Sequence, residues 1–165
     1  MNRAETSPIV RLDLERAHRF RVRFESGAPC LIVDEPPPLG TGSGPDPSSL
    51  LASAVGGCLA SSFLFCVRKA RIEPLGLEVE VRLEHERNAE GRMRIGRIRA
   101  RLVPHVEERD RARLRACIDL YESFCTVTES VRQGIPVDVL LEPMEAGTPG
   151  WPSWSATRAA LGSLS

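Results

Sequence analysis

PDPSSLLASAVGGC, residues 45–58, predicts the start of a long apolar helix. Asp46 is a residue type that commonly caps a helix N-terminus, and Pro47 suits the first helical position. Apolar residues then continue to about residue 72, and basic side chains near that end complement the helix dipole. A helix of about 25 residues is about 37 Å long. We therefore expect it to be the central helix of the fold, buried on most sides.

Strands and shorter helices are predicted on both sides of this helix. Alternating apolar and charged residues indicate strands with one solvated face, and apolar residues at helical spacing indicate a helix. The order of strands, long helix, strands, helix and strand is typical of an α+β domain. The expected elements are a hairpin at 9–14 and 20–24, a strand at 30–34, an irregular loop at 35–45, the long helix, a hairpin at 75–85 and 93–103, a helix at 107–123, a short helix after Cys125, and a strand at 135–141.

The composition indicates one domain of ordinary size. The chain has 165 residues, 42% of them hydrophobic, which is enough to form a core. Lys+Arg and Asp+Glu number 22 each, so a formal net charge of zero gives no general attraction to nucleic acid or anionic membranes. We expect no N-terminal targeting segment and no apolar run approaching the roughly 20 residues that span a bilayer. These features predict a cytoplasmic protein whose partners are small molecules or copies of itself.

We divide the chain into a domain over residues 1–142 and a C-terminal tail over residues 143–165. The tail carries Trp151 and Trp154 among small and polar residues. We expect it to be flexible.

Two of the five cysteines lie in unusual local sequences. Cys58 follows two glycines inside the long helix, where glycine is unfavourable by roughly 1 kcal/mol relative to alanine, so something approaches the backbone there. Tight helix packing is the other explanation. Cys125 precedes a short helix, whose N-terminal dipole and amides favour a thiolate, although a cysteine can also merely close a loop. If the fold brings Cys58 and Cys125 together, we expect a thiol redox enzyme.

The other three cysteines and the histidines give weaker signals. Cys66 and Cys117 are expected to be small core side chains, and Cys30 an inert residue beside a strand. No cysteine pair has the spacing of a metal site, and the three histidines are isolated, so we predict no metal. The sequence neither shows nor excludes a histidine placed beside a cysteine, as a Cys-His nucleophile pair for acyl transfer requires. The glycine-rich residues 40–44 lack the context of a dinucleotide loop and are expected to be a flexible connection, so we predict no cofactor.

With these features the chain resembles the OsmC/Ohr family of organic hydroperoxide peroxidases. The resemblance covers residues 9–141. It rests on the N-terminal hairpin, on a Pro-x-x-Leu-Leu helix start with a cysteine eleven residues after the proline, and on a second cysteine in a Cys-x-Val-[Ser/Thr] segment. The residues that carry it are Pro47, Leu50, Leu51, Gly57, Cys58, Cys125, Val127 and Thr128.

The resemblance implies an OsmC-like α+β fold, with antiparallel strands around the long helix. It also implies an intertwined homodimer with two sites at its interface. Cys58 is then the peroxidatic cysteine, which becomes a sulfenic acid, and Cys125 is the resolving cysteine, which closes a disulfide that a dithiol reductant reopens. The expected partners are an organic hydroperoxide, the dithiol and the second subunit, with no nucleic acid and no membrane.

The chain departs from the family pattern at the charged residues of the site. Family members generally carry a glutamate in the helix-start motif, where this chain has Ser48 and Ser49. Serine cannot pair ionically with an arginine, and Asp46 is the nearest acid. Arg16 and Arg19, in the turn of the first hairpin, are the candidates for the arginine that supports the thiolate. The leading hypothesis is a thiol peroxidase, and the alternative is a non-catalytic redox sensor or a dimer that binds an apolar ligand.

Overall fold

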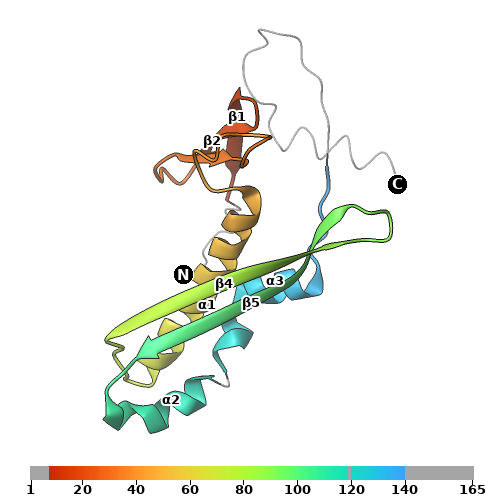
Figure 1. Cartoon of the computed structure of the whole chain (residues 1–165). Coiled ribbons are helices and arrows are strands. Elements are labelled where there is room, and N and C mark those ends of the chain that lie inside the picture. Colours follow the sequence, from red (N-terminus) through yellow and green to blue (C-terminus); the bar gives the residue numbers. More distant parts are fainter. Residues whose placement is uncertain (1–7, 119, 140–165) are drawn as a thin grey trace, which may run out of the picture. The chain divides into compact units, whose positions relative to one another are not determined.

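The computed structural model describes residues 8–118 and 120–139 (Figure 1). The chain divides into two units at Gly134, and every element below belongs to the first unit. The expected domain boundary at residue 142 and the tail with Trp151 and Trp154 lie outside the described residues. The elements are β1 (Val10–Arg16), β2 (Arg19–Phe24), β3 (Leu31–Asp34), α1 (Pro47–Lys69), β4 (Gly76–Arg87), β5 (Met93–His105), η1 (Glu108–Asp110), α2 (Arg111–Ile118), η2 (Tyr121–Phe124) and α3 (Thr126–Gln133).

The expected long helix is confirmed as α1, with 23 residues. Asp46 is its N-cap, and its carboxylate accepts a hydrogen bond from the backbone N–H of Ser49 at 3.0 Å. Buried residues recur along one side of α1, at positions Val55, Leu59, Phe63 and Val67, which are four residues apart and therefore share one face. This face joins α1 to the two buried clusters of the domain.

The expectation that α1 is buried on most sides is wrong for the single chain. Only 33% of its most apolar 18-residue window is buried, and the Phe65 side chain is 60% exposed. The expectation that no segment reaches the length and apolarity of a membrane span is also wrong, because α1 meets both conditions. One side of α1 packs against β4, α2, η2 and α3.

The three N-terminal strands form an antiparallel sheet in the order β1-β2-β3. The predicted hairpin and third strand are confirmed, with Leu12 opposite Val22 and Phe20 opposite Val33. Val22 and Val33 are buried, whereas Leu12 and Leu14 on β1 are 45% and 63% exposed. The apolar side of β1 is thus uncovered by the residues that the structure describes.

The second predicted hairpin is confirmed as the antiparallel pair β4–β5, which lies across α1 in Figure 1. Gly56 of α1 faces β4 so closely that a Cβ atom there would lie 2.9 Å from Val81 Cγ2. Gly57 points into open space, with no atom within 4 Å of such a Cβ. Tight packing therefore explains Gly56 but not Gly57.

The helix expected over residues 107–123 is broken into η1, α2 and η2. The backbone N–H of Leu120 reaches back to the carbonyl of Cys117, a three-residue spacing that tightens the helix end. Tyr121 then packs edge-on against Phe63 of α1, with ring centroids 5.6 Å apart. The helix is therefore interrupted where Tyr121 contacts α1. This tertiary contact cannot be predicted from the local sequence.

The last expected strand is not formed by residues 135–139, and the rest of that segment lies outside the described residues. Gly134 ends α3 with a φ of 73°, and Val137 and Val139 are each 81% exposed. Alternating apolar residues form a strand only when another strand pairs with them. In the described residues, none pairs with this segment.

The glycine-rich loop is held by a buried carboxylate rather than being a free connection. Asp34, which is 1% exposed, accepts hydrogen bonds from the backbone N–H and the hydroxyl of both Thr41 and Ser43. These hydrogen bonds hold the pKa of Asp34 well below its usual range. Gly40 passes so close that a Cβ there would overlap Asp34 and the Glu35 carbonyl. The loop therefore leads into α1 along a defined path.

Candidate active site

Cys58 and Cys125, which are far apart in the sequence, lie together in the fold. Cys125 is fully buried in a cluster with Val55 and Leu59 of α1, and Cys58 packs against this cluster. Cys58 comes from the middle of α1, and Cys125 is the residue that caps the N-terminus of α3. The two thiols are close enough for each to influence the pKa of the other.

The surroundings of Cys125 favour its thiolate. Its sulfur lies 2.8 Å from the hydroxyl oxygen of Thr128, one turn into α3. Burial raises the pKa of Cys125, but hydrogen bonds from Cys58, from the hydroxyl and N–H of Thr128, and from Ser62 outweigh it and lower the pKa overall. The expected effect of a helix N-terminus on this thiol is thereby reinforced by two hydroxyl side chains.

The surroundings of Cys58 favour its neutral thiol. Burial raises the pKa of Cys58, and the neighbouring Cys125 thiol raises it further, against weaker opposing effects of the backbone N–H groups of Val127 and Thr128. Two thiols this close share one negative charge more readily than they carry two. Cys58 is half-buried and Cys125 is buried, so Cys58 is the more accessible residue of the pair.

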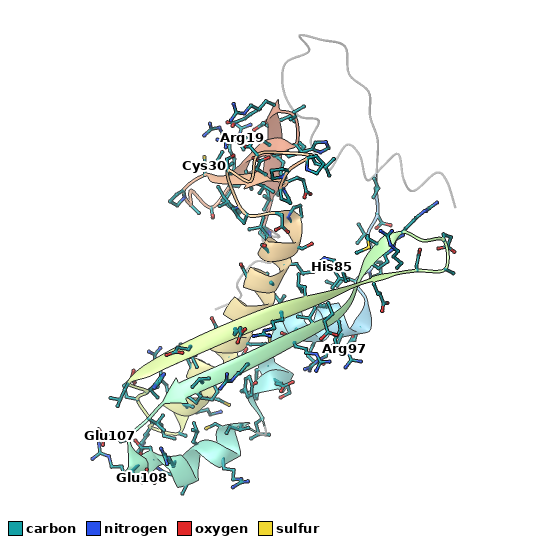
Figure 2. All side chains as sticks on the ribbon, viewed as in Figure 1. Arg19, Cys30, His85, Arg97, Glu107 and Glu108 are labelled. Atoms are coloured by element: carbon teal, nitrogen blue, oxygen red, sulfur yellow. The ribbon has the colours of Figure 1, made fainter. Side chains whose placement is uncertain are left out.

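The charged residues named from the sequence do not contact Cys58 within the chain. Arg19 is bound to Glu15 at 2.8 Å and to the hydroxyl of Ser43. Arg16, at the end of β1, is exposed. Figure 2 labels Arg19 on the three-stranded sheet, where it lies opposite Asp34. No hydrogen bond or ion pair joins Arg16 or Arg19 to a cysteine among the described residues.

Asp46, Ser48 and Ser49 shape the start of α1 rather than the thiol pair. Ser49 donates from its hydroxyl to Asp46 at 2.8 Å, in addition to its backbone hydrogen bond. Hydrogen bonds from the backbone and side chain of Ser49 lower the pKa of Asp46. Both carboxylate oxygens of Asp46 are thus used in capping, and Ser48 is half-buried in the first turn.

A cavity of about 530 Å³ lies between α1, β5, η2 and α3, and neither Cys58 nor Cys125 is among the residues that line it. Leu51, Val55 and Leu59 form its α1 side, so a ligand in it meets mainly aliphatic carbon there. Thr128, the partner of Cys125, also lines it. Arg97, labelled on β5 in Figure 2, and Arg132 supply charge at its wall, and Arg132 is bound to Glu122 and Glu129.

Three comparisons place this arrangement among known proteins. The family model described as "OsmC-like protein" matches residues 40–140, which is more than half of the chain and includes both cysteines of the pair. This chain belongs to the OsmC-like protein family. No curated protein matches its sequence significantly.

Solved structures show that this OsmC-like protein has the family fold. An OsmC-like protein from Mycoplasma pneumoniae superposes with a TM-score of 0.66 at 16% identity, covering 79% of this chain and 90% of the other. The organic hydroperoxide resistance protein OsmC from Legionella pneumophila gives 0.59 at 17% identity, covering 78% and 91%. The organic hydroperoxide resistance protein OhrB of Bacillus subtilis gives 0.55 at 19% identity, covering 76% and 90%. These likenesses confirm the α+β, OsmC-like fold class expected from the sequence.

Sequence reasoning missed Thr128 and Ser62 as neighbours of the thiol pair. Thr128 was noted only as part of the family motif, although a hydroxyl three residues after a helix-capping cysteine can reach its sulfur. Ser62 lies one turn after Cys58 on α1 and is buried, which is unusual for serine. Its place beside Cys125 depends on how α1 and α3 pack. No group of three or more potential metal ligands occurs among the residues described.

Proposed function

We propose that this OsmC-like protein is a cysteine-based peroxidase that reduces organic hydroperoxides. The observation that carries the proposal is the placement of half-buried Cys58 and buried Cys125 in one cluster, next to Thr128, which also lines the cavity. The printed names of two structural neighbours, organic hydroperoxide resistance proteins, agree with this chemistry and support a redox role.

In the proposed reaction the Cys58 sulfur attacks the distal oxygen of the hydroperoxide. The O–O bond breaks, the alcohol leaves after taking up a proton, and Cys58 becomes a sulfenic acid. The Cys125 sulfur then attacks the Cys58 sulfur, water leaves and a disulfide forms. A dithiol reductant supplies the two electrons and two protons that restore both thiols.

We propose that Cys125 also acts in the first step. Its pKa is lowered, that of Cys58 is raised and the two residues lie in one cluster, so in this proposal the Cys125 thiolate accepts the Cys58 proton as the peroxide reacts. Replacing Cys125 with serine therefore slows the first oxidation of Cys58 in addition to preventing disulfide closure. A purely resolving cysteine would leave the rate of that first step unchanged.

The decisive experiment treats the reduced protein with one equivalent of an alkyl hydroperoxide and maps its thiols by mass spectrometry. We expect a Cys58–Cys125 disulfide and repeated turnover in excess dithiol. Cys58→Ser should abolish turnover, Cys125→Ser should stop after one oxidation, and Cys30→Ser should behave as the parent protein, because Cys30 is an exposed thiol on the three-stranded sheet. Oxidation scattered over the cysteines without turnover would contradict the proposal.

The second candidate function is a redox sensor or a dimer that binds an apolar ligand. It is favoured by Ser48 and Ser49 at the position of the family glutamate, and by the use of Asp46 in helix capping. A sensor oxidises once and stops, whereas the enzyme consumes peroxide in proportion to the dithiol supplied. Turnover counting therefore separates the two functions.

We further propose a homodimer and a cytoplasmic location. Exposed apolar residues on β1 and α1, among them Leu14 at 63% and Phe65 at 60%, support burial against a second copy. All five cysteines are free, as expected in a reducing compartment. Analytical ultracentrifugation of the full chain tests the dimer.

A further inference from the structure

A second pair of cysteines connects α1 to α2, outside the pair used above. Cys66 of α1 packs against the buried cluster that contains Cys117, the last residue but one of α2. Cys117 is 5% exposed and Cys66 is half-buried. The sequence had indicated two unrelated core residues, but the fold places them as neighbours.

The helix faces explain why these thiols meet. Cys66 follows Phe63 by three residues, and Cys117 follows Leu114 by three, so each cysteine shares a face with a residue of the same buried cluster. The two faces pack against each other where α1 contacts α2. Burial raises the pKa of Cys117. The neighbouring Cys66 thiol raises the pKa of Cys117 further, which agrees with direct contact of the two side chains.

We propose that Cys66 and Cys117 are a second oxidisable dithiol, which closes into a disulfide between α1 and α2. With a hydroperoxide as oxidant, the more exposed Cys66 sulfur attacks the distal oxygen, the O–O bond breaks and an alcohol leaves. The Cys117 sulfur then attacks the Cys66 sulfenic acid, and the hydroxyl leaves as water with the proton of Cys117. Two thiols are thus oxidised by two electrons, and one hydroperoxide becomes one alcohol and one water.

This pair is independent of the Cys58–Cys125 pair. Eight residues separate Cys58 from Cys66, a rise of about 12 Å along a helix. Disulfide partners have Cα atoms no more than about 7 Å apart, so Cys58 and Cys66 do not pair with each other. Oxidation of Cys66 and Cys117 therefore leaves the peroxidase pair chemically intact and ties α2 to the central helix.

The test uses the full chain with Cys58→Ser and Cys125→Ser, which retains Cys30, Cys66 and Cys117. It is treated with cumene hydroperoxide, alkylated under denaturing conditions and mapped by mass spectrometry. We expect one alkylated thiol per chain, at Cys30, a mass lower by two hydrogen atoms, and one cross-linked peptide joining Cys66 to Cys117. The oxidised form should also unfold at a higher temperature, because the bond restricts the unfolded chain.

Single variants show which sulfur reacts first. In this background Cys117→Ser should leave a sulfenic acid on Cys66 that a cyclic 1,3-diketone traps, whereas Cys66→Ser should give no adduct on the buried Cys117. Cys30→Ser is the matched control and should still form the cross-link. If a serine variant fails to fold, the same mapping is made on the parent protein, where two equivalents of peroxide should give two disulfides.

Three results would overturn the proposal. These are free thiols at both Cys66 and Cys117 after treatment, whatever the state of Cys30, a disulfide that uses Cys30, or a Cys66 link between different chains. Because the main test lacks Cys58 and Cys125, its failure says nothing against the proposed peroxidase. Failure of peroxidase turnover in the parent protein likewise leaves this cross-link testable.

Discussion

Replacement of Gly57 by alanine should stabilise this protein, whereas replacement of Gly56 by alanine should not. The two glycines are adjacent in α1, and either substitution gains about 1 kcal/mol because alanine is the better helix former. They differ in what the new methyl group meets. At Gly56 the Cβ would lie 2.9 Å from Val81 Cγ2 and 3.5 Å from Val79 Cγ1, whereas at Gly57 nothing lies within 4 Å.

The difference between the two variants isolates the cost of the close contact. Helix propensity contributes equally to both, so it cancels in the comparison. Forcing an extra methyl group into a packed interior costs about 1–3 kcal/mol. We therefore expect Gly57→Ala to stabilise by about 1 kcal/mol and Gly56→Ala to be about 1–3 kcal/mol less stable than Gly57→Ala.

The assay is urea unfolding followed by far-ultraviolet circular dichroism, with both variants at the same protein concentration. Equal stabilisation by both substitutions would refute the argument that β4 requires glycine at position 56. Destabilisation by Gly57→Ala would show that another surface covers Gly57 in solution. The proposed homodimer is the arrangement that would account for that result.

Three further predictions concern the thiol pair and the segment that leads to it. Thr128→Val removes the hydroxyl at 2.8 Å from the Cys125 sulfur, so the pKa of Cys125 should rise, measured as a thiolate absorbance titration against Cys125→Ser, while Thr128→Ser should retain the parent titration. Asp34→Asn should destabilise the protein at neutral pH. Because the pKa of Asp34 is depressed in the folded protein, the stability that this carboxylate adds is present above its ordinary pKa of 3.8 and is lost as the pH falls below that value. The difference in unfolding free energy between parent and variant should therefore shrink in acid. Asp46→Ala should cost about 1 kcal/mol in urea unfolding, with Asp46→Asn close to the parent, because a cap needs an acceptor rather than a charge.

Local sequence signals predicted the elements that local interactions stabilise. The cap at Asp46, the proline after it and the apolar run defined α1 to within a few residues. Alternation defined the β1–β2 and β4–β5 hairpins, because their strands are close in the sequence. The strand predicted over residues 135–141 is not formed by residues 135–139, because alternation alone does not supply a neighbouring strand.

The candidate site was predictable only in part. The family motif pointed to Cys58 and Cys125. The lowered pKa of Cys125 depends on Thr128, which is three residues away on α3, and on Ser62, which reaches Cys125 through the packing of α1 against α3. The contact between Cys66 and Cys117 likewise depends on how two helices meet. Such tertiary contacts have no spacing rule in the sequence.

Two properties of the described residues support the proposed homodimer. The groups that shift the pKa of Cys58 are its burial, the Cys125 thiol and two backbone N–H groups, and none of them is cationic. A peroxidatic thiolate is stabilised by a nearby cation. The exposed rings of Phe65 and Phe124, with centroids 6.4 Å apart, form an apolar surface that ordinarily lies against protein.

A second copy of the chain meets both requirements, because it supplies an apolar face and arginines of its own. The peroxidase rate per chain should therefore fall on dilution, at the same protein concentration at which sedimentation shows the dimer dissociating. Phe65→Glu should lower the concentration of dimer and the activity together, whereas Arg82→Glu, at an exposed residue of β4, should change neither. An activity that is constant across dissociation would show that one chain holds the complete site, and Cys125 would then be the group that activates Cys58.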